Sequence, residues 1–190
     1  MFEHFTTVEE IFNYKLGSAL TMEYDSLEML GELEKTVMRS DLKGLFHEHA
    51  HETRQQIENL LRCFALLGVE AKQSPSPTTK GLAKETKLFT AKTDNSLVDA
   101  VALAGALESE HYETAVYETL ITHAKASGVS EIVHLLSSNL AQEESAIMRI
   151  RAAADAVVRA DATNAADQGD AGAVQDASVQ VPPFLPPSSI

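Results

Sequence analysis

Four long segments of the chain carry apolar residues at steps of three and four, and acid interrupts each of these apolar stripes. Such steps keep residues on one face of an α-helix, so each stripe predicts a helix whose polar residues point into a core. The interrupting residues are Glu23, His49, Glu52, Gln56, Glu110, Glu113 and Glu143. Because a buried charge is costly unless it is paired or bound to metal, we expect the four helices to pack around these groups.

Capping residues and glycines set the expected ends of these helices. Thr7 and Glu10 form a capping-box pattern, which opens a helix that should run to about Arg39. The other long helices are predicted over residues 40–68, 96–126 and 130–160. Residues 69–95 form a loop with room for one short helix over 82–92, and a connection of this length is typical of a crossover along a bundle. The prediction is an all-α, antiparallel four-helix bundle in residues 1–160.

The remaining residues, 161–190, are expected to form a tail. The first part is rich in Ala, Asp, Gln and Gly and lacks the apolar residues that packing needs, which predicts disorder. At its end two proline pairs flank Phe184 and Leu185, which favours an extended conformation with exposed apolar side chains. This end is either a plain flexible tail or a peptide that docks on a protein partner.

The composition excludes some classes of function. A net charge of −13 argues against binding to nucleic acid or to an anionic membrane. No window is apolar enough for a membrane span and the start lacks a signal peptide, so we expect a cytoplasmic protein. Cys63, the one cysteine, is expected in the core. Apolar positions expected to face outward, at Met22, Met29 and Leu61, favour a homodimer.

The depth of the acids predicts that they meet. Glu23 and Glu52 are 29 positions apart around one predicted turn, and Glu110 and Glu143 are 33 apart around the other. Residues at similar distances from a turn lie at similar depth in an antiparallel hairpin, so the stacked hairpins should bring these acids and Glu113 together.

Clustered carboxylates in a core cannot all stay ionised without cations, because repulsion and desolvation raise their pKa values. A pair of divalent metals would resolve this, and an imidazole such as that of His49 favours iron or manganese over calcium or magnesium. Exposed helix faces, or a network of protonated acids, are the alternatives.

These residues also carry a resemblance. The run from Phe46 to Thr53 (Phe-His-Glu-His-Ala-His-Glu-Thr), the run Glu110-His-Tyr-Glu113 and the later Glu143 resemble the YciE/YciF family of ferritin-like stress proteins, over about residues 5–155. The resemblance implies a ferritin-like, usually dimeric bundle with a di-iron or di-manganese site. It assigns the ligands to Glu23, His49, Glu52, Glu110, Glu113 and Glu143. The chain departs from the family pattern at Gln56 and Ile147, where many relatives carry His and an acid.

The leading functional hypothesis is a di-metal oxidoreductase or iron-handling protein, in which two ferrous ions reduce peroxide or dioxygen. His49 would be a terminal ligand, and Glu52 and Glu113 the bridges. Gln56 and Tyr117 are expected beside the ligands, with Tyr117 a hydrogen-bond donor, an electron relay or simply part of the core. The alternatives are a non-enzymatic structural stress protein, and a cargo or adaptor protein docked through its proline-rich terminus.

Overall fold

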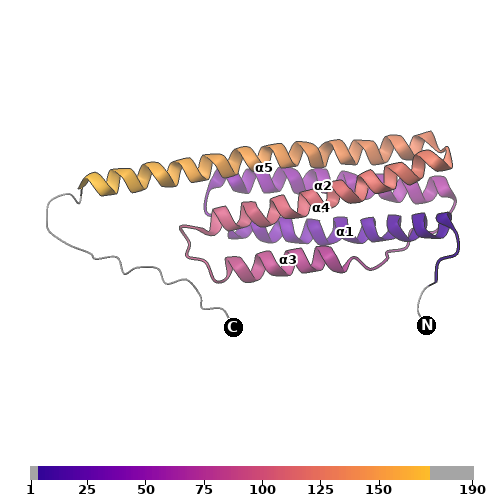
Figure 1. The fold of residues 1–190 in the computed structure, drawn as a ribbon, viewed down its shortest axis with the longest axis horizontal. Helices are drawn as coiled ribbons and strands as arrows, with labels where there is room; N and C mark the ends of the chain where they lie inside the picture. The colour runs from indigo at the N-terminus through magenta and orange to yellow at the C-terminus, as the bar shows by residue number, and fades with distance from the viewer. Residues whose placement is uncertain (1–3, 172–190) are drawn as a thin grey trace, which may run out of the picture.

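The computed structural model describes residues 4–171, which form helices and no strand. The helices are α1 (Val8–Thr36), α2 (Ser40–Leu67), α3 (Pro77–Thr90), α4 (Val98–Ser127) and α5 (Ser130–Ala171). Figure 1 shows α1, α2, α4 and α5 side by side as an antiparallel bundle, with the shorter α3 along one flank. The predicted all-α bundle with a crossover between its second and third long helices is therefore confirmed. No helix within residues 4–171 is long and apolar enough to cross a membrane.

The predicted helix ends are mostly correct. Thr7 caps α1 and forms the full capping box with Glu10. Gly68 and Gly128 end α2 and α4 with φ of 69° and 74°, a conformation that glycine adopts without steric cost. The fourth long helix is longer than expected, because α5 continues to Ala171 instead of ending near residue 160.

This extension corrects part of the tail prediction. Residues 161–171, expected to be disordered, are helical, and Figure 1 shows the end of α5 projecting past the other helices. Low apolar content predicts that a segment cannot pack, whereas alanine, frequent here, still favours continuation of a helix that has already formed. The proline-rich end lies outside the described residues.

Two glycines let the crossover lie close against the bundle. A Cβ atom on Gly17 of α1 would stand 2.4 Å from the carbonyl oxygen of Lys72, and the Gly17 carbonyl accepts a 3.0 Å hydrogen bond from the Ser74 amide. A Cβ atom on Gly105 of α4 would stand 2.2 Å from Oγ1 of Thr86 in α3. Larger residues at either position would push the crossover away.

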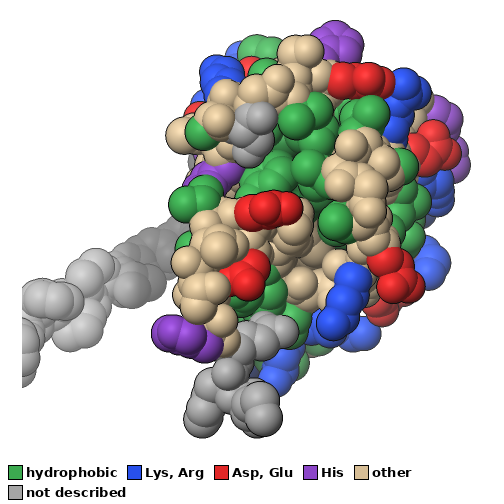
Figure 2. Space-filling view, turned by 90° about the vertical axis from the view of Figure 1, so that its right-hand side faces the viewer, with side chains coloured by type: hydrophobic (Ala, Val, Ile, Leu, Met, Phe, Trp, Pro, Cys, Tyr) green, Lys and Arg blue, Asp and Glu red, His purple; other side chains and the backbone are tan. Residues whose placement is uncertain are grey.

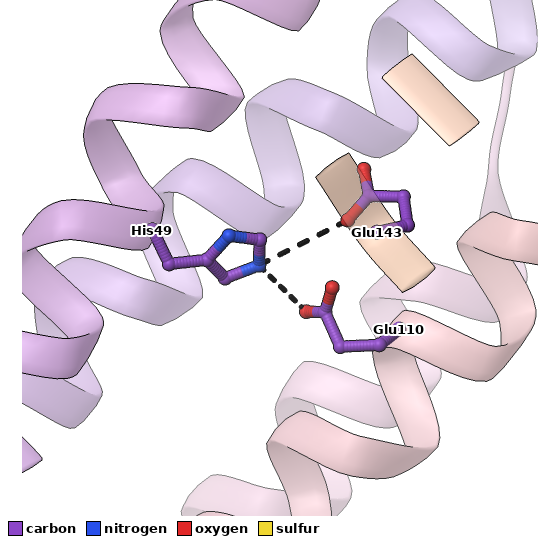
Figure 3. Close-up of side chains that lie close together, drawn as sticks. All are labelled: His49, Glu110 and Glu143. Atoms are coloured by element: carbon purple, nitrogen blue, oxygen red, sulfur yellow. Dashed lines mark hydrogen bonds and ion pairs between the residues drawn. The ribbon is translucent and has the colours of Figure 1, made fainter. Parts of the chain in front are cut away.

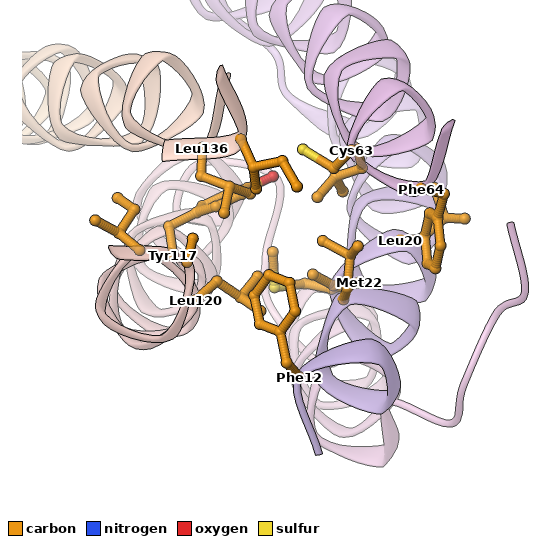
Figure 4. Packing of buried hydrophobic residues seen from close by; sticks show 14 of the residues in the cluster. Phe12, Leu20, Met22, Cys63, Phe64, Tyr117, Leu120 and Leu136 are labelled. Carbon is orange, nitrogen blue, oxygen red and sulfur yellow. The ribbon is translucent and has the colours of Figure 1, made fainter. Parts of the chain in front are cut away.

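Two apolar clusters fill the bundle, one on each side of the acids. Side chains from all four long helices converge in the first cluster, with Phe12, Cys63, Tyr117 and Leu136 among them (Figure 4). The second cluster includes Phe46 and lies toward the other end of the bundle. Together they enclose the layer of acids between apolar walls, and the expected core placement of Cys63 is correct.

One expectation about the surface is wrong. Met22 and Met29, expected to face outward, are buried with 0% and 6% exposure, whereas Leu61 is 39% exposed. Apolar side chains instead reach the surface at the end of the bundle where α1 begins and α2 ends, among charged and histidine side chains (Figure 2). Phe5 and Val8 lie beside the start of α1.

Candidate metal centre

The acid layer is the set of buried residues Glu23, His49, Glu110, Glu113 and Glu143, and His49 is its imidazole. It lies on the inner face of α2, one turn after Phe46, and is 2% exposed. Figure 3 shows its imidazole pointing from α2 toward the carboxylates of Glu110 and Glu143. Its Nε2 atom lies 2.9 Å from Oε1 of Glu110 and 4.0 Å from Oε2 of Glu143.

Two groups of three possible ligands form within the described residues. His49, Glu110 and Glu143 bring one ligand atom each to within 4.8 Å of one another, and so do Glu23, Glu113 and Glu143. Glu143 is common to both groups. Five of the six predicted ligands therefore meet, and they come from all four long helices.

Unpartnered oxygen atoms show that this layer fits cations. Oε2 of Glu23, Oε2 of Glu110 and both carboxylate oxygens of Glu143 are buried and have no hydrogen-bond partner within residues 4–171. Leaving such groups unpaired in a core is expensive. Hard oxygen donors with one imidazole nitrogen are a donor set that iron and manganese accept, so the residues present fit the expected ions.

Burial and neighbouring charges raise the pKa values of three acids in the layer. Burial, assisted by the charge of Glu110, raises the pKa of Glu23 to about 8, although the hydrogen bond from Tyr117 opposes the shift. Burial and the neighbouring carboxylates also raise the pKa values of Glu113 and Glu143 well above the usual range. Without metal, the layer therefore holds protons in the place of cations.

The pKa of the His49 imidazole is raised, so its positive charge complements these acids. Burial alone would lower the pKa of His49, but the Glu110 carboxylate and the hydrogen bonds to Glu110 and Glu52 raise it to about 10. Without metal, His49 is therefore a cation that partly neutralises the layer. A metal ion at Nε2 would take the place of the proton there.

Tyr117 contacts the predicted ligand Glu23, and Gln56 is buried on the inner face of α2. The Tyr117 hydroxyl donates a hydrogen bond to Oε1 of Glu23 and accepts one of 3.0 Å from Nδ2 of Asn139. The side-chain amide of Gln56 is buried and has no hydrogen-bond partner within the described residues. Asn139 was missed by the sequence analysis, although it interrupts the apolar stripe between Leu136 and Glu143.

Glu52 is the predicted ligand that the structure places elsewhere. Its side chain is 23% exposed, and both its oxygens contact the guanidinium of Arg149 in α5. Its Oε2 atom also lies 3.2 Å from Nδ1 of His49. Burial would raise its pKa, but the hydrogen bonds from His49 and Arg149 outweigh burial and lower it to about 2. Glu52 belongs to neither three-ligand group among residues 4–171.

The sequence comparisons place the chain in a family. The model of a family described as "Domain of unknown function (DUF892)" matches residues 7–163. The chain belongs to this family. It is 28% identical over 146 residues to the protein YciF of Escherichia coli strain K12, a match that covers 76% of this chain and 88% of YciF.

Solved structures of this kind agree with the fold. The crystal structure of YciF, described as a stress protein of E. coli, superposes with a TM-score of 0.77 at 26% identity, covering 82% of this chain and 99% of YciF. YcfI from Rhodopseudomonas palustris, described as a proposed structural protein, gives a TM-score of 0.76 at 30% identity, covering 80% of this chain and 98% of YcfI. The chain is therefore a YciF-like member of the DUF892 family.

Proposed function

We propose that this DUF892 protein is a YciF-like stress protein that binds two iron or manganese ions in its acid layer. The observation that carries the proposal is Glu143, which belongs to both ligand groups and has two unpartnered oxygens. A carboxylate can bridge two cations, one through each oxygen. His49 and Glu110 would complete one position, and Glu23 and Glu113 the other.

The other residues of the layer prepare these ligands. Tyr117 occupies Oε1 of Glu23, which leaves Oε2 for a cation. Ser109 donates a 2.9 Å hydrogen bond to Oε1 of Glu113 and holds that side chain in the same way. The apolar clusters on both sides exclude bulk water, which strengthens the attraction between carboxylates and cations.

In this setting a pair of redox-active metal ions would supply electrons to peroxide or dioxygen. We place this chemistry in the cytoplasm, where reducing conditions keep iron ferrous. Glu52 also stands as a predicted ligand, but both its oxygens already accept hydrogen bonds from Arg149.

Metal content per chain tests the binding proposal. Protein purified without chelators, or reconstituted with Fe²⁺ or Mn²⁺, is expected to hold two ions, because the layer offers two ligand groups. Glu143→Gln should lose binding at both positions, whereas Glu118→Gln, which removes an exposed acid from α4, should keep both ions. A reconstituted wild type that holds no metal after desalting would refute the proposal.

A structural role is the second candidate, and it is favoured by the description of YcfI and by the ability of the layer to hold protons instead of metal. In this case metal would only stabilise the bundle. Consumption of peroxide or oxidation of Fe²⁺ by the wild type, lost in Glu143→Gln, would support the oxidoreductase. Metal binding without turnover would support the structural role.

Two proposals concern partners. We propose a homodimer, because Phe5, Val8 and Leu61 leave apolar surface on the chain. Light scattering that gives the mass of one chain would reject it.

The adaptor role concerns residues 178–190, outside the described part, and deleting them should abolish co-purification of a partner while metal content stays the same. Unchanged co-purification would reject the adaptor role.

A further inference from the structure

We propose that Glu52 and Arg149 position His49 for metal instead of binding metal themselves. This inference rests on the proposed metal centre and assigns a task to two residues at its edge. Glu52 would hold the imidazole, and Arg149 would hold Glu52. The three side chains form a line from half-exposed surface to buried ligand, with Arg149 at the outer end and His49 at the inner end.

The two ring nitrogens of His49 face different neighbours. Nε2 faces Glu110 and Glu143, two of the acids with unpartnered oxygens, whereas Nδ1 lies 3.2 Å from Glu52. A carboxylate beside Nδ1 keeps the proton on that nitrogen when a metal displaces the proton from Nε2. Glu52 thus selects the nitrogen that faces the centre and fixes the plane of the ring.

Arg149 makes Glu52 a poor candidate for a metal ligand. Its two terminal nitrogens contact the two oxygens of Glu52, with 2.8 Å between Nη1 and Oε1. This paired geometry fixes the carboxylate plane, and the positive charge of the guanidinium would repel an approaching metal ion. A metal ion at Glu52 would have to compete with these hydrogen bonds and with the charge of the guanidinium.

The arrangement also joins two helices. Glu52 and His49 are one turn apart on α2, whereas Arg149 lies on α5, which carries Glu143. The orientation of the α2 ligand is therefore tied to the helix that supplies the shared carboxylate. A simple interhelical ion pair would stabilise the bundle, but it would not decide which nitrogen of His49 carries the proton.

The test is a double-mutant cycle on Mn²⁺ affinity, measured by the loss of the electron paramagnetic resonance signal of free Mn²⁺. Glu52→Leu removes the acceptor and should weaken Mn²⁺ binding at the position that includes His49 about 10- to 100-fold, the usual effect of losing a partner of a ligating histidine. Glu52→Gln keeps an acceptor oxygen and should lose less. Glu58→Gln, an exposed acid on the same helix, should bind as wild type does.

The cycle separates positioning from ligation. In a His49→Gln background, Glu52→Leu should add no further loss, because Glu52 would act only through His49. Nitrogen NMR of the Zn²⁺-loaded protein should show one His49 form, with a proton on Nδ1, and a mixture in Glu52→Leu. An equal loss in both backgrounds, or an unchanged His49 spectrum, would overturn the inference.

Failure of the proposed function looks different. If wild type binds no Mn²⁺, the metal centre and the positioning role both fall. If wild type binds and His49→Gln loses one ion while Glu52→Leu has no effect, the centre stands and only the positioning role is refuted.

Discussion

Raising the pH of the metal-free protein should destabilise it. The folded protein keeps a proton on Glu23 up to a pKa of about 8, whereas the unfolded chain releases it near the usual 4.5. Between these values the folded state binds more protons, so its stability falls as pH rises. For Glu23 alone the loss between pH 5 and pH 7.5 is about 3 kcal/mol.

Other groups of the layer act in the same direction over this range. The pKa values of Glu113 and Glu143 are also raised, so they add to the loss. The pKa of His49 is raised from 6.5 to about 10, and its stabilising contribution fades above its unfolded value. The lowered pKa of Glu52 has the opposite effect, but only below about 4.5, outside the range.

Thermal melts in EDTA at several pH values measure this effect. A loss of about 3 kcal/mol corresponds to a fall in Tm of about 6 to 12 °C for a domain of this size. Mn²⁺ at pH 7.5 should reverse the fall, because an ion that binds only the folded state stabilises it. Glu23→Gln should remove the share of the pH dependence that Glu23 contributes, and Glu118→Gln on the surface of α4 should leave the dependence unchanged. Equal Tm values at pH 5 and 7.5 would refute the reasoning.

Three further predictions concern single side chains and use urea unfolding of the metal-free protein. Tyr117→Phe leaves Oε1 of Glu23 without its donor and should lower the free energy of unfolding by about 1 to 3 kcal/mol. An unchanged urea midpoint would contradict the contact between Tyr117 and Glu23. Gly105→Ala should lower the free energy of unfolding by about 1 to 3 kcal/mol, because its Cβ would clash with Thr86. Cleavage by protease should also increase within the crossover. Wild-type stability and cleavage would mean that α3 does not pack against Gly105. Phe46→Ala should cost about 3 to 5 kcal/mol by opening a cavity in the second cluster, and a loss under 1 kcal/mol would show that this site is not packed.

The sequence predicts the fold and most of the centre because both depend on periodicity. Apolar steps of three and four place Glu23, Glu110, Glu113 and Glu143 on inner faces, and distances from the turns place them at one depth. His49 follows from the same pattern, one turn after Phe46. Each of these positions agrees with the structure, in which all five side chains are buried.

The same pattern cannot place Glu52. After His49 a step of three reaches Glu52 and a step of four reaches Thr53, and either is compatible with a helical stripe. The structure buries Thr53, whereas Glu52 turns toward α5. Arg149 could not be found from periodicity, because it is not an inner residue of its helix and its role depends on an acid 97 positions earlier.

The division of the predicted ligands between the two hairpins has a consequence for biosynthesis. The α1–α2 hairpin, with Glu23 and His49, leaves the ribosome before α4 and α5 have been made. Glu110, Glu113 and Glu143 all arrive with the later hairpin, so no complete group of three ligands exists while the chain is still growing through α4. In the proposed centre, metal could therefore bind only after α5 has also been made, and a nascent chain stalled in α4 would not compete with the finished protein for cellular iron or manganese.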